Sequence, residues 1–129
     1  MFSLRRETDY ALRLLKTLST APKGRASLMT VSNQTGISFL FLQKIARKLR
    51  IAGLIKSTKG VSGGYELKIK PNKLSLKNII SVVEGGCALW SCCEGGGGCA
   101  QEKCGIRKRA KTVNKKVLKF LTDVKLSDF

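Results

Sequence analysis

A mainly α-helical fold with one small β-hairpin is predicted by three features of this 129-residue sequence. Apolar residues recur at helical spacing in several separate segments. Glycines and polar capping residues divide these segments, and one short stretch alternates apolar and charged residues as a strand does. The length suits one domain with an accessory helix.

The first predicted helix spans residues 8–18 and carries one apolar face. Thr8 and Asp9 are both suited to its N-cap, because short oxygen-bearing side chains accept hydrogen bonds from the free amides of a first turn. A second, shorter helix is predicted around Leu28 and Val31. The apolar face of the first helix consists of Ala11, Leu14, Leu15 and Leu18.

A basic third helix is predicted over residues 39–52, after a turn that contains Gly36. Ser38 is suited to cap this helix and Gly53 to end it. Two helices joined by a tight turn, the second of them basic, are typical of a helix-turn-helix. The inward positions of the third helix are Leu42, Ile45 and Leu49.

A β-hairpin is predicted after the third helix. Residues 54–58 form its first strand, and residues 65–70 alternate apolar and charged side chains in the period of a half-buried strand. The glycine-rich turn between them begins at Lys59, and such a turn can approach a phosphate backbone or a minor groove closely. The hairpin completes the pattern of a winged helix-turn-helix.

Two more helices are predicted in the C-terminal part. Ser75 is suited to cap a fourth helix that ends before Gly85. In the last helix, apolar residues recur at alternating steps of four and three, which is the spacing of a coiled coil. A homodimer through this helix is the favoured prediction, and docking of the helix on its own domain is the alternative. The predicted seam consists of Ile106, Ala110, Val113, Val117, Phe120 and Val124.

The charge distribution predicts binding to double-stranded DNA. The net charge is +17, and no acidic residue lies between Tyr10 and Tyr65, a stretch with ten lysines and arginines. A generally basic protein without such a partner is the alternative. Gln43 is the predicted base-edge contact, and Arg47 a phosphate contact. The predicted DNA contacts are Ser38, Leu40, Gln43, Lys44, Arg47 and Lys59.

Other classes of protein are less favoured. The chain has no histidine, no nucleotide-binding loop and no general base beside a nucleophile, so an enzyme is not expected. It has no signal peptide and no run of 18 apolar residues, so a cytoplasmic protein without a membrane partner is expected. RNA binding is disfavoured because aromatic residues are only 6% of the chain, and Phe39, Phe41 and Tyr65 are predicted to belong to the core.

All five cysteines lie in the glycine-rich segment 85–105. Disulfides are not expected in a reducing compartment, and soft thiolates favour an iron-sulfur cluster or zinc. The paired Cys-x-x-Cys knuckles of structural zinc are absent, which favours the cluster. Basic residues nearby lower the cost of thiolate charge: Lys103, Arg107, Lys108 and Arg109.

The sequence is similar to a family in four segments and in the cysteine loop. The segments are residues 8–13, 36–38, 52–55 and 59–65. Together they resemble the winged-helix bacterial regulators that include IscR and NsrR, and the likeness covers nearly the whole chain. This resemblance implies a homodimer on a pseudo-palindromic operator, with residues 1–84 as the DNA-binding domain, 85–105 as the cluster-binding loop and 106–129 as the dimerisation helix and tail.

The resemblance also implies an iron-sulfur cluster, of the 4Fe-4S or 2Fe-2S type, with Cys93, Cys99 and Cys104 as the matching cysteine ligands. IscR-like members add a histidine shortly after the third cysteine, where this chain has Arg107. NsrR-like members use an aspartate at the start of the first helix, which Asp9 matches. The ligand pattern is therefore closest to NsrR.

Some positions depart from the family pattern. The interval from Cys99 to Cys104 is one residue shorter than usual, and Cys87 and Cys92 are additional. Cys92 is thus an alternate to Cys93, and either additional cysteine is an alternate to Asp9. As a ligand, Asp9 would tie the loop to the first helix and create a switch. Its rival role is that of a helix cap alone.

The expected function is that of a DNA-binding transcriptional regulator, expected to be a repressor. Its operator affinity would depend on a cluster that senses nitric oxide, redox or iron status. The alternative within this class is a cluster-free regulator that works through cysteine oxidation or a partner protein.

Overall fold

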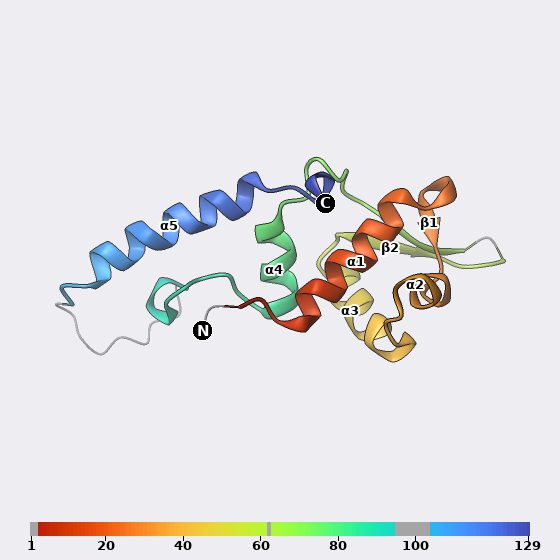
Figure 1. Ribbon diagram of the computed structural model, residues 1–129, viewed down its shortest axis with the longest axis horizontal. Coiled ribbons are helices and arrows are strands. Elements are labelled where there is room, and N and C mark those ends of the chain that lie inside the picture. The colour runs from red at the N-terminus through yellow and green to blue at the C-terminus, as the bar shows by residue number, and fades with distance from the viewer. Residues whose placement is uncertain (1–2, 62, 95–103) are drawn as a thin grey trace.

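Three helices and a small sheet form one end of the molecule in the computed structural model, which describes residues 3–61, 63–94 and 104–129 (Figure 1). Helices α1 (Arg6–Thr20) and α3 (Phe39–Ile51) pack against each other, and α2 (Leu28–Thr35) packs on α3. A 3-10 turn, η1 (Pro22–Gly24), follows α1. The side chains that fill the core are Leu14, Leu15, Leu18, Leu42, Ile45, Leu49, Ile55, Leu74, Ile79 and Leu126.

Helix α1 begins earlier than the sequence predicts, and neither predicted cap is a cap. Arg5 is the N-cap residue and makes no side-chain capping bond. Thr8 is instead fully buried, and its Oγ1 donates to Oε1 of Glu84 at 2.5 Å. Asp9 lies in the first turn and pairs with Nε of Arg13 at 3.0 Å. The predicted capping role of Thr8 or Asp9 is therefore wrong, because Thr8 bonds to a residue 76 positions away.

The helix-turn-helix is confirmed in detail. Ser27 caps α2 by accepting from the amide of Thr30 at 3.1 Å, and Gly36 ends α2 with a left-handed φ of 74°. Ser38 caps α3 by accepting from the amide of Phe41 at 3.3 Å. The predicted inward residues of α3 are buried, namely Leu42, Ile45 and Leu49.

Two aromatic residues of α3 differ from their predicted place. Phe39 and Phe41 are 37% and 47% exposed, so the prediction that they belong to the core is wrong. The ring of Phe41 packs edge-on against Tyr10 of α1, with centroids 5.9 Å apart. Both residues lie in the first turn of α3, which projects beyond α1.

The sheet has three antiparallel strands rather than the predicted two. Its strands are β1 (Arg25–Ala26), β2 (Ile55–Thr58) and β3 (Gly64–Leu67), in the order β1-β3-β2. A two-residue strand has no period to read, which is why β1 was not predicted. Gly64 permits this pairing, because a Cβ there would lie 2.7 Å from the carbonyl oxygen of Ala26.

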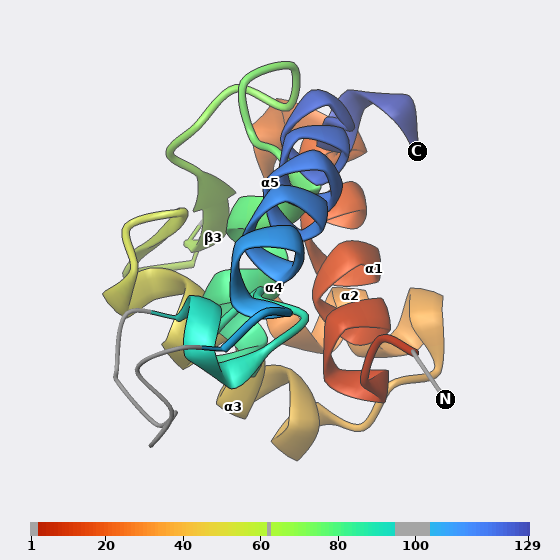
Figure 2. The ribbon, with the colours of Figure 1, turned by 90° about the vertical axis from the view of Figure 1, so that its left-hand side faces the viewer.

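Helix α4 (Leu76–Glu84) covers the core from the other side and is capped by Ser75, as predicted. The chain then passes through a 3-10 turn, η2 (Ser91–Cys93), and returns as α5 (Arg107–Asp123), which lies across α4 (Figure 2). No helix in the described ranges is long and apolar enough to cross a membrane.

The C-terminal tail closes the core. After α5 the chain forms a short 3-10 turn, η3 (Leu126–Asp128), and the side chain of Leu126 is fully buried. The amide of Leu126 donates to the carbonyl of Leu74 at 2.9 Å, and the amide of Leu76 donates to the carbonyl of Val124 at 2.8 Å. These bonds fix the end of α5 beside the start of α4.

Candidate DNA interface and cysteine loop

The outer face of α3 carries four of the residues predicted to contact DNA. Leu40, Gln43, Lys44 and Arg47 are all exposed, and Leu40 is 76% exposed. Their spacing of three and four residues places them on neighbouring lines of one helix surface. The exposed Ser38 lies just before them, with its hydroxyl oxygen accepting the capping bond.

Glu7 of α1 binds two lysines of α3, which the sequence did not predict. Its Oε1 lies 2.8 Å from Nζ of Lys44, and its Oε2 lies 3.2 Å from Nζ of Lys48. Hydrogen bonds from these two lysines hold the pKa of the Glu7 carboxyl below its ordinary value. Lys44 is therefore exposed but already paired with a carboxylate.

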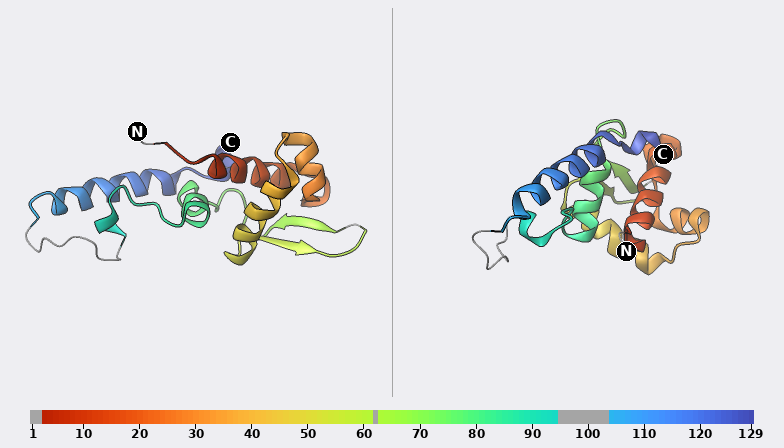
Figure 3. Two further views of the ribbon diagram at one scale, coloured as in Figure 1. Left: turned by 90° about the horizontal axis from the view of Figure 1, so that it is seen from below. Right: turned by 60° about the vertical axis from the view of Figure 1, so that its left-hand side comes forward.

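The hairpin of β2 and β3 projects beside α3 as the wing (Figure 3). Lys59 is exposed near its tip, as predicted. Glu66 of β3 pairs with Lys56 of β2 at 2.7 Å and with Arg25 of β1 at 3.6 Å. The hydrogen bond from Lys56 holds the pKa of the Glu66 carboxyl below its ordinary value. This acid at the end of the basic block thus ties the three strands together.

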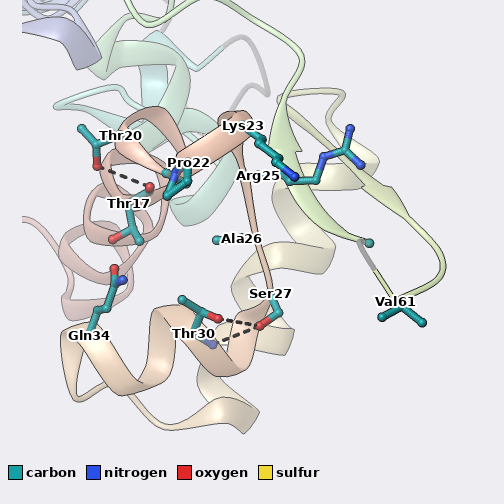
Figure 4. A pocket seen from close by; sticks show the side chains of 12 residues that line it. Thr17, Thr20, Pro22, Lys23, Arg25, Ala26, Ser27, Thr30, Gln34 and Val61 are labelled. Atoms are coloured by element: carbon teal, nitrogen blue, oxygen red, sulfur yellow. Dashed lines mark hydrogen bonds between the residues drawn. The ribbon is translucent and has the colours of Figure 1, made fainter.

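A polar hollow of about 600 Å³ lies between the end of α1, β1, the start of α2 and the wing (Figure 4). Hydroxyl groups of Thr20, Ser27 and Thr30 line it together with Lys23. Val61, near the wing tip, completes its rim. Sequence reasoning missed these residues, because the hollow forms only when η1 and β1 bring the end of α1 next to the wing.

The segment after α4 is tied to α5 by a buried amide side chain. Asn114 of α5 is 6% exposed, and its Oδ1 accepts from the amide of Leu89 at 2.9 Å. The turn η2 also packs against α5. The described stretch with Cys92 and Cys93 is therefore positioned by α5.

Two of the cysteines line a second hollow, which lies between α4 and α5. Cys87 and Cys93 are half-buried and face it together with Lys77 and Ser81. Burial raises the pKa of the Cys87 thiol. Desolvation raises the pKa of the Cys93 thiol, and the adjacent Cys92 raises it further. Without a metal these thiols stay protonated near neutral pH, so metal binding must displace their protons.

One further predicted cysteine ligand, Cys104, lies at the other end of the segment, within the described residues. Cys104 is half-buried just before α5, and Cys99 lies outside the described residues. The four described cysteines are free thiols. The described residues contain no cluster of three or more ligand side chains that could hold a metal ion.

The described thiols lie near charges of both signs, since Glu84 and Glu94 lie close to Cys87 along with Lys77. Arg107 and Lys111 of α5 are close enough to Cys93 to favour its thiolate form. The Nε of Arg107 is buried and has no hydrogen-bond partner among the described residues. A buried cationic group in need of an acceptor fits an anionic thiolate-bound cluster at this place. The donor set and the surrounding charge are thus compatible with iron-sulfur ligation.

Asp9 does not line the hollow that the described Cys87 and Cys93 share. It is exposed, pairs with Arg13 and lines a different hollow, together with Leu12 and Phe129. Cys87 and Cys93 face the hollow between α4 and α5. Among the described residues, Asp9 and these two cysteines therefore belong to separate hollows.

The predicted seam of α5 is divided between two environments. Ala110 is buried within the chain, whereas Ile106, Val113 and Phe120 are 69%, 45% and 66% exposed. Helix α5 thus docks on its own α4 with one face and leaves an apolar strip on another. We call Ile106, Val113 and Phe120 the α5 strip.

The fold, with its capped α3, adjacent wing and long last helix, defines a winged helix-turn-helix protein. The chain matches the Rrf2 family, described as iron-dependent transcriptional regulators, over residues 4–129. It therefore belongs to the Rrf2 family, which confirms the resemblance to IscR and NsrR.

Individual relatives agree with this assignment. The chain is 36% identical to the HTH-type transcriptional regulator IscR of Aliivibrio salmonicida over 61% of its own length and 50% of that protein. It is 34% identical to NsrR of Shouchella clausii over 66% of its length and 58% of that protein. The chain thus spans only about half the length of these relatives. Its fold is similar to that of CymR, the global cysteine regulator of B. subtilis, with a TM-score of 0.79, 26% identity, and coverage of 99% of this chain and 95% of CymR.

Proposed function

We propose that the protein is a homodimeric transcriptional repressor that binds double-stranded DNA and whose affinity depends on an iron-sulfur cluster. One observation carries the DNA-binding part: the exposed face of α3 lies beside a basic wing, and all six predicted contact residues are accessible. An α-helix with such a face fits the major groove, while Lys59 of the wing reaches the neighbouring minor groove or backbone.

Roles on DNA follow from side-chain chemistry. Gln43 can donate to and accept from a base edge, so it discriminates between sequences. Arg47, one turn further, contacts phosphate and sets the register. The polar hollow near α2 offers Ser27, Thr30 and Lys23 to the backbone between the major groove and the wing.

The first test compares two substitutions on an operator selected from a random-sequence duplex pool. Gln43→Ala is expected to weaken operator binding by about 1–3 kcal/mol and to leave binding to a scrambled duplex unchanged. Arg47→Gln is expected to weaken binding to the operator and to the scrambled duplex alike, and to reduce the dependence of log affinity on log salt concentration, the salt slope, by about one. Fluorescence anisotropy over a series of salt concentrations measures both quantities.

Lys119→Gln is the matched control for Arg47→Gln, because it removes one exposed positive charge from α5 rather than from α3. Equal losses in Lys119→Gln and Arg47→Gln would contradict a specific DNA interface on α3. Equal losses of Gln43→Ala on operator and scrambled duplex would contradict base readout by Gln43.

The cluster would be held by Cys93, Cys99 and Cys104, with Asp9 of a second protomer as the fourth ligand and Cys92 as an alternate. When bound, the cluster would supply iron that nitric oxide or oxygen can attack and that is lost when iron is scarce. The chain itself supplies the positive charge of Arg107 and Lys111, and Asn114 holds the backbone at Leu89. Release of Asp9 would then free α1 and shift the population of DNA-competent dimers.

Thiol oxidation without a cluster is the second candidate mechanism. Cys87 and Cys93 line one hollow as free thiols, which places both within reach of one oxidant, although their raised pKa values slow the reaction. Anaerobic purification separates the two mechanisms, because a cluster gives brown protein with visible absorbance and stoichiometric iron and sulfide, whereas free thiols give colourless protein.

The dimer part of the proposal rests on the α5 strip. Phe120→Glu is expected to raise the dimer dissociation constant about thirtyfold, because loss of a central apolar anchor costs about 2 kcal/mol. Met29→Glu is the control, since Met29 is a similarly exposed apolar residue on α2. Sedimentation equilibrium measures both variants. Unchanged dimerisation in Phe120→Glu would place the interface elsewhere.

A further inference from the structure

The contact between α1 and α3 has an electrostatic consequence at the proposed DNA interface. Glu7 binds Lys44 and Lys48, and we call these three residues the Glu7 cluster. Among the described residues, both ion pairs made by α3 end on this one carboxylate. The Glu7 side chain is 23% exposed, so the carboxylate remains at the surface, next to the outer face of α3.

The Glu7 cluster also has an anchor on α4. Nζ of Lys48 donates to the carbonyl oxygen of Val83 at 3.1 Å, in addition to its bond with Glu7. Lys44 and Lys48 are four residues apart and therefore share the side of α3 that faces α1. Gln43 and Arg47 lie on the neighbouring side, and Arg47 is in none of the ion pairs of the described residues.

The Glu7 cluster contributes little to the stability of the fold, but it changes how strongly α3 attracts a polyanion such as DNA. Ion pairs at a surface are typically worth about 0–1 kcal/mol each. Each lysine that instead neutralises a DNA phosphate adds about 0.9 to the salt slope of binding. A carboxylate that occupies two such lysines withdraws them from this sequence-independent attraction and repels nearby phosphates.

We propose that Glu7 is a specificity-determining residue, which withholds Lys44 and Lys48 from non-specific phosphate contacts so that Gln43 and Arg47 govern the choice of site. This inference rests on the proposed DNA-binding function. The inference also changes the role of Lys44, which the sequence predicts as a DNA contact, because Glu7 neutralises part of its charge. The basic block from Tyr10 to Tyr65 contains no acidic residue. The carboxylate that pairs with the lysines of α3 therefore comes from Glu7, which precedes this block in α1.

The test uses Glu7→Gln in the full chain, which removes the charge and keeps the shape of the side chain. Binding to a scrambled duplex is expected to tighten about tenfold and its salt slope to steepen by about one, because at least one lysine is freed. The affinity ratio between selected operator and scrambled duplex is expected to fall. Thermal unfolding of the variant shows separately that it folds.

Asp123→Asn is the matched control, since it makes the same change of net charge at the far end of α5. Its salt slope is expected to equal that of the wild type. Glu7→Gln in a Lys44→Gln, Lys48→Gln background is expected to give no gain in affinity. Equal behaviour of Glu7→Gln and Asp123→Asn would overturn the inference, whereas a wild type that binds neither duplex would overturn the proposed DNA-binding function itself.

Discussion

Cys104→Ser is expected to abolish the visible absorbance of anaerobically purified protein and to lower bound iron more than about tenfold. Loss of an outer-shell partner alone typically costs about 10–100-fold in metal affinity, and loss of a direct ligand costs more. The same result is expected for Cys93→Ser. Iron and sulfide analysis with absorption spectroscopy measures the effect.

Matched controls come from the two additional cysteines. Cys87→Ser and Cys92→Ser are expected to keep normal iron content, because neither matches the ligand pattern of the family. Loss of iron in Cys92→Ser with retention in Cys93→Ser would exchange the roles of these adjacent residues. A normal cluster in Asp9→Ala would contradict the proposed switch through α1 and leave the cysteine ligands unaffected.

Leu126→Ala is expected to lower the free energy of unfolding by about 3 kcal/mol, because removal of a fully buried leucine side chain leaves a cavity. Phe129→Ala, three residues further along the same tail, is the control. Phe129 is 54% exposed, and its replacement is expected to change stability by less than about 0.5 kcal/mol. Urea unfolding followed by circular dichroism measures both. Similar stability of the two variants would show that the tail does not contribute to the core.

The parts of the fold that follow local rules were predicted well. Ser38 and Ser75 cap the helices that they were expected to cap, and the predicted inward positions of α3 are buried. The start of α1 was not predicted, because Thr8 bonds to Glu84 of α4. The strand β1 was missed because its position depends on pairing with β3 rather than on a pattern of its own.

In the candidate site too, features that follow local rules were predicted, and features that depend on contacts between distant residues were not. The exposure of Gln43 and Arg47 follows from helical periodicity and was predicted. The contact of Glu7 with Lys44 depends on how α1 crosses α3, which no local pattern encodes. The joint position of Cys87 and Cys93 depends on the bond between Leu89 and Asn114, which joins residues 25 positions apart.

The backbone hydrogen bonds that hold the tail beside α4 fix one end of α5, so a tilt of this helix would displace its other end the most. With 17 residues at about 1.5 Å each, the helix is about 25 Å long, and backbone hydrogen bonds hold its C-terminal end beside α4, at the point about which a tilt of the helix would turn. A rotation of about 5° at this pivot moves the opposite end by about 2 Å. Cys104 lies three residues before the opposite end of α5, so in the proposed homodimer a small rearrangement at this thiol would change the angle between the two long helices.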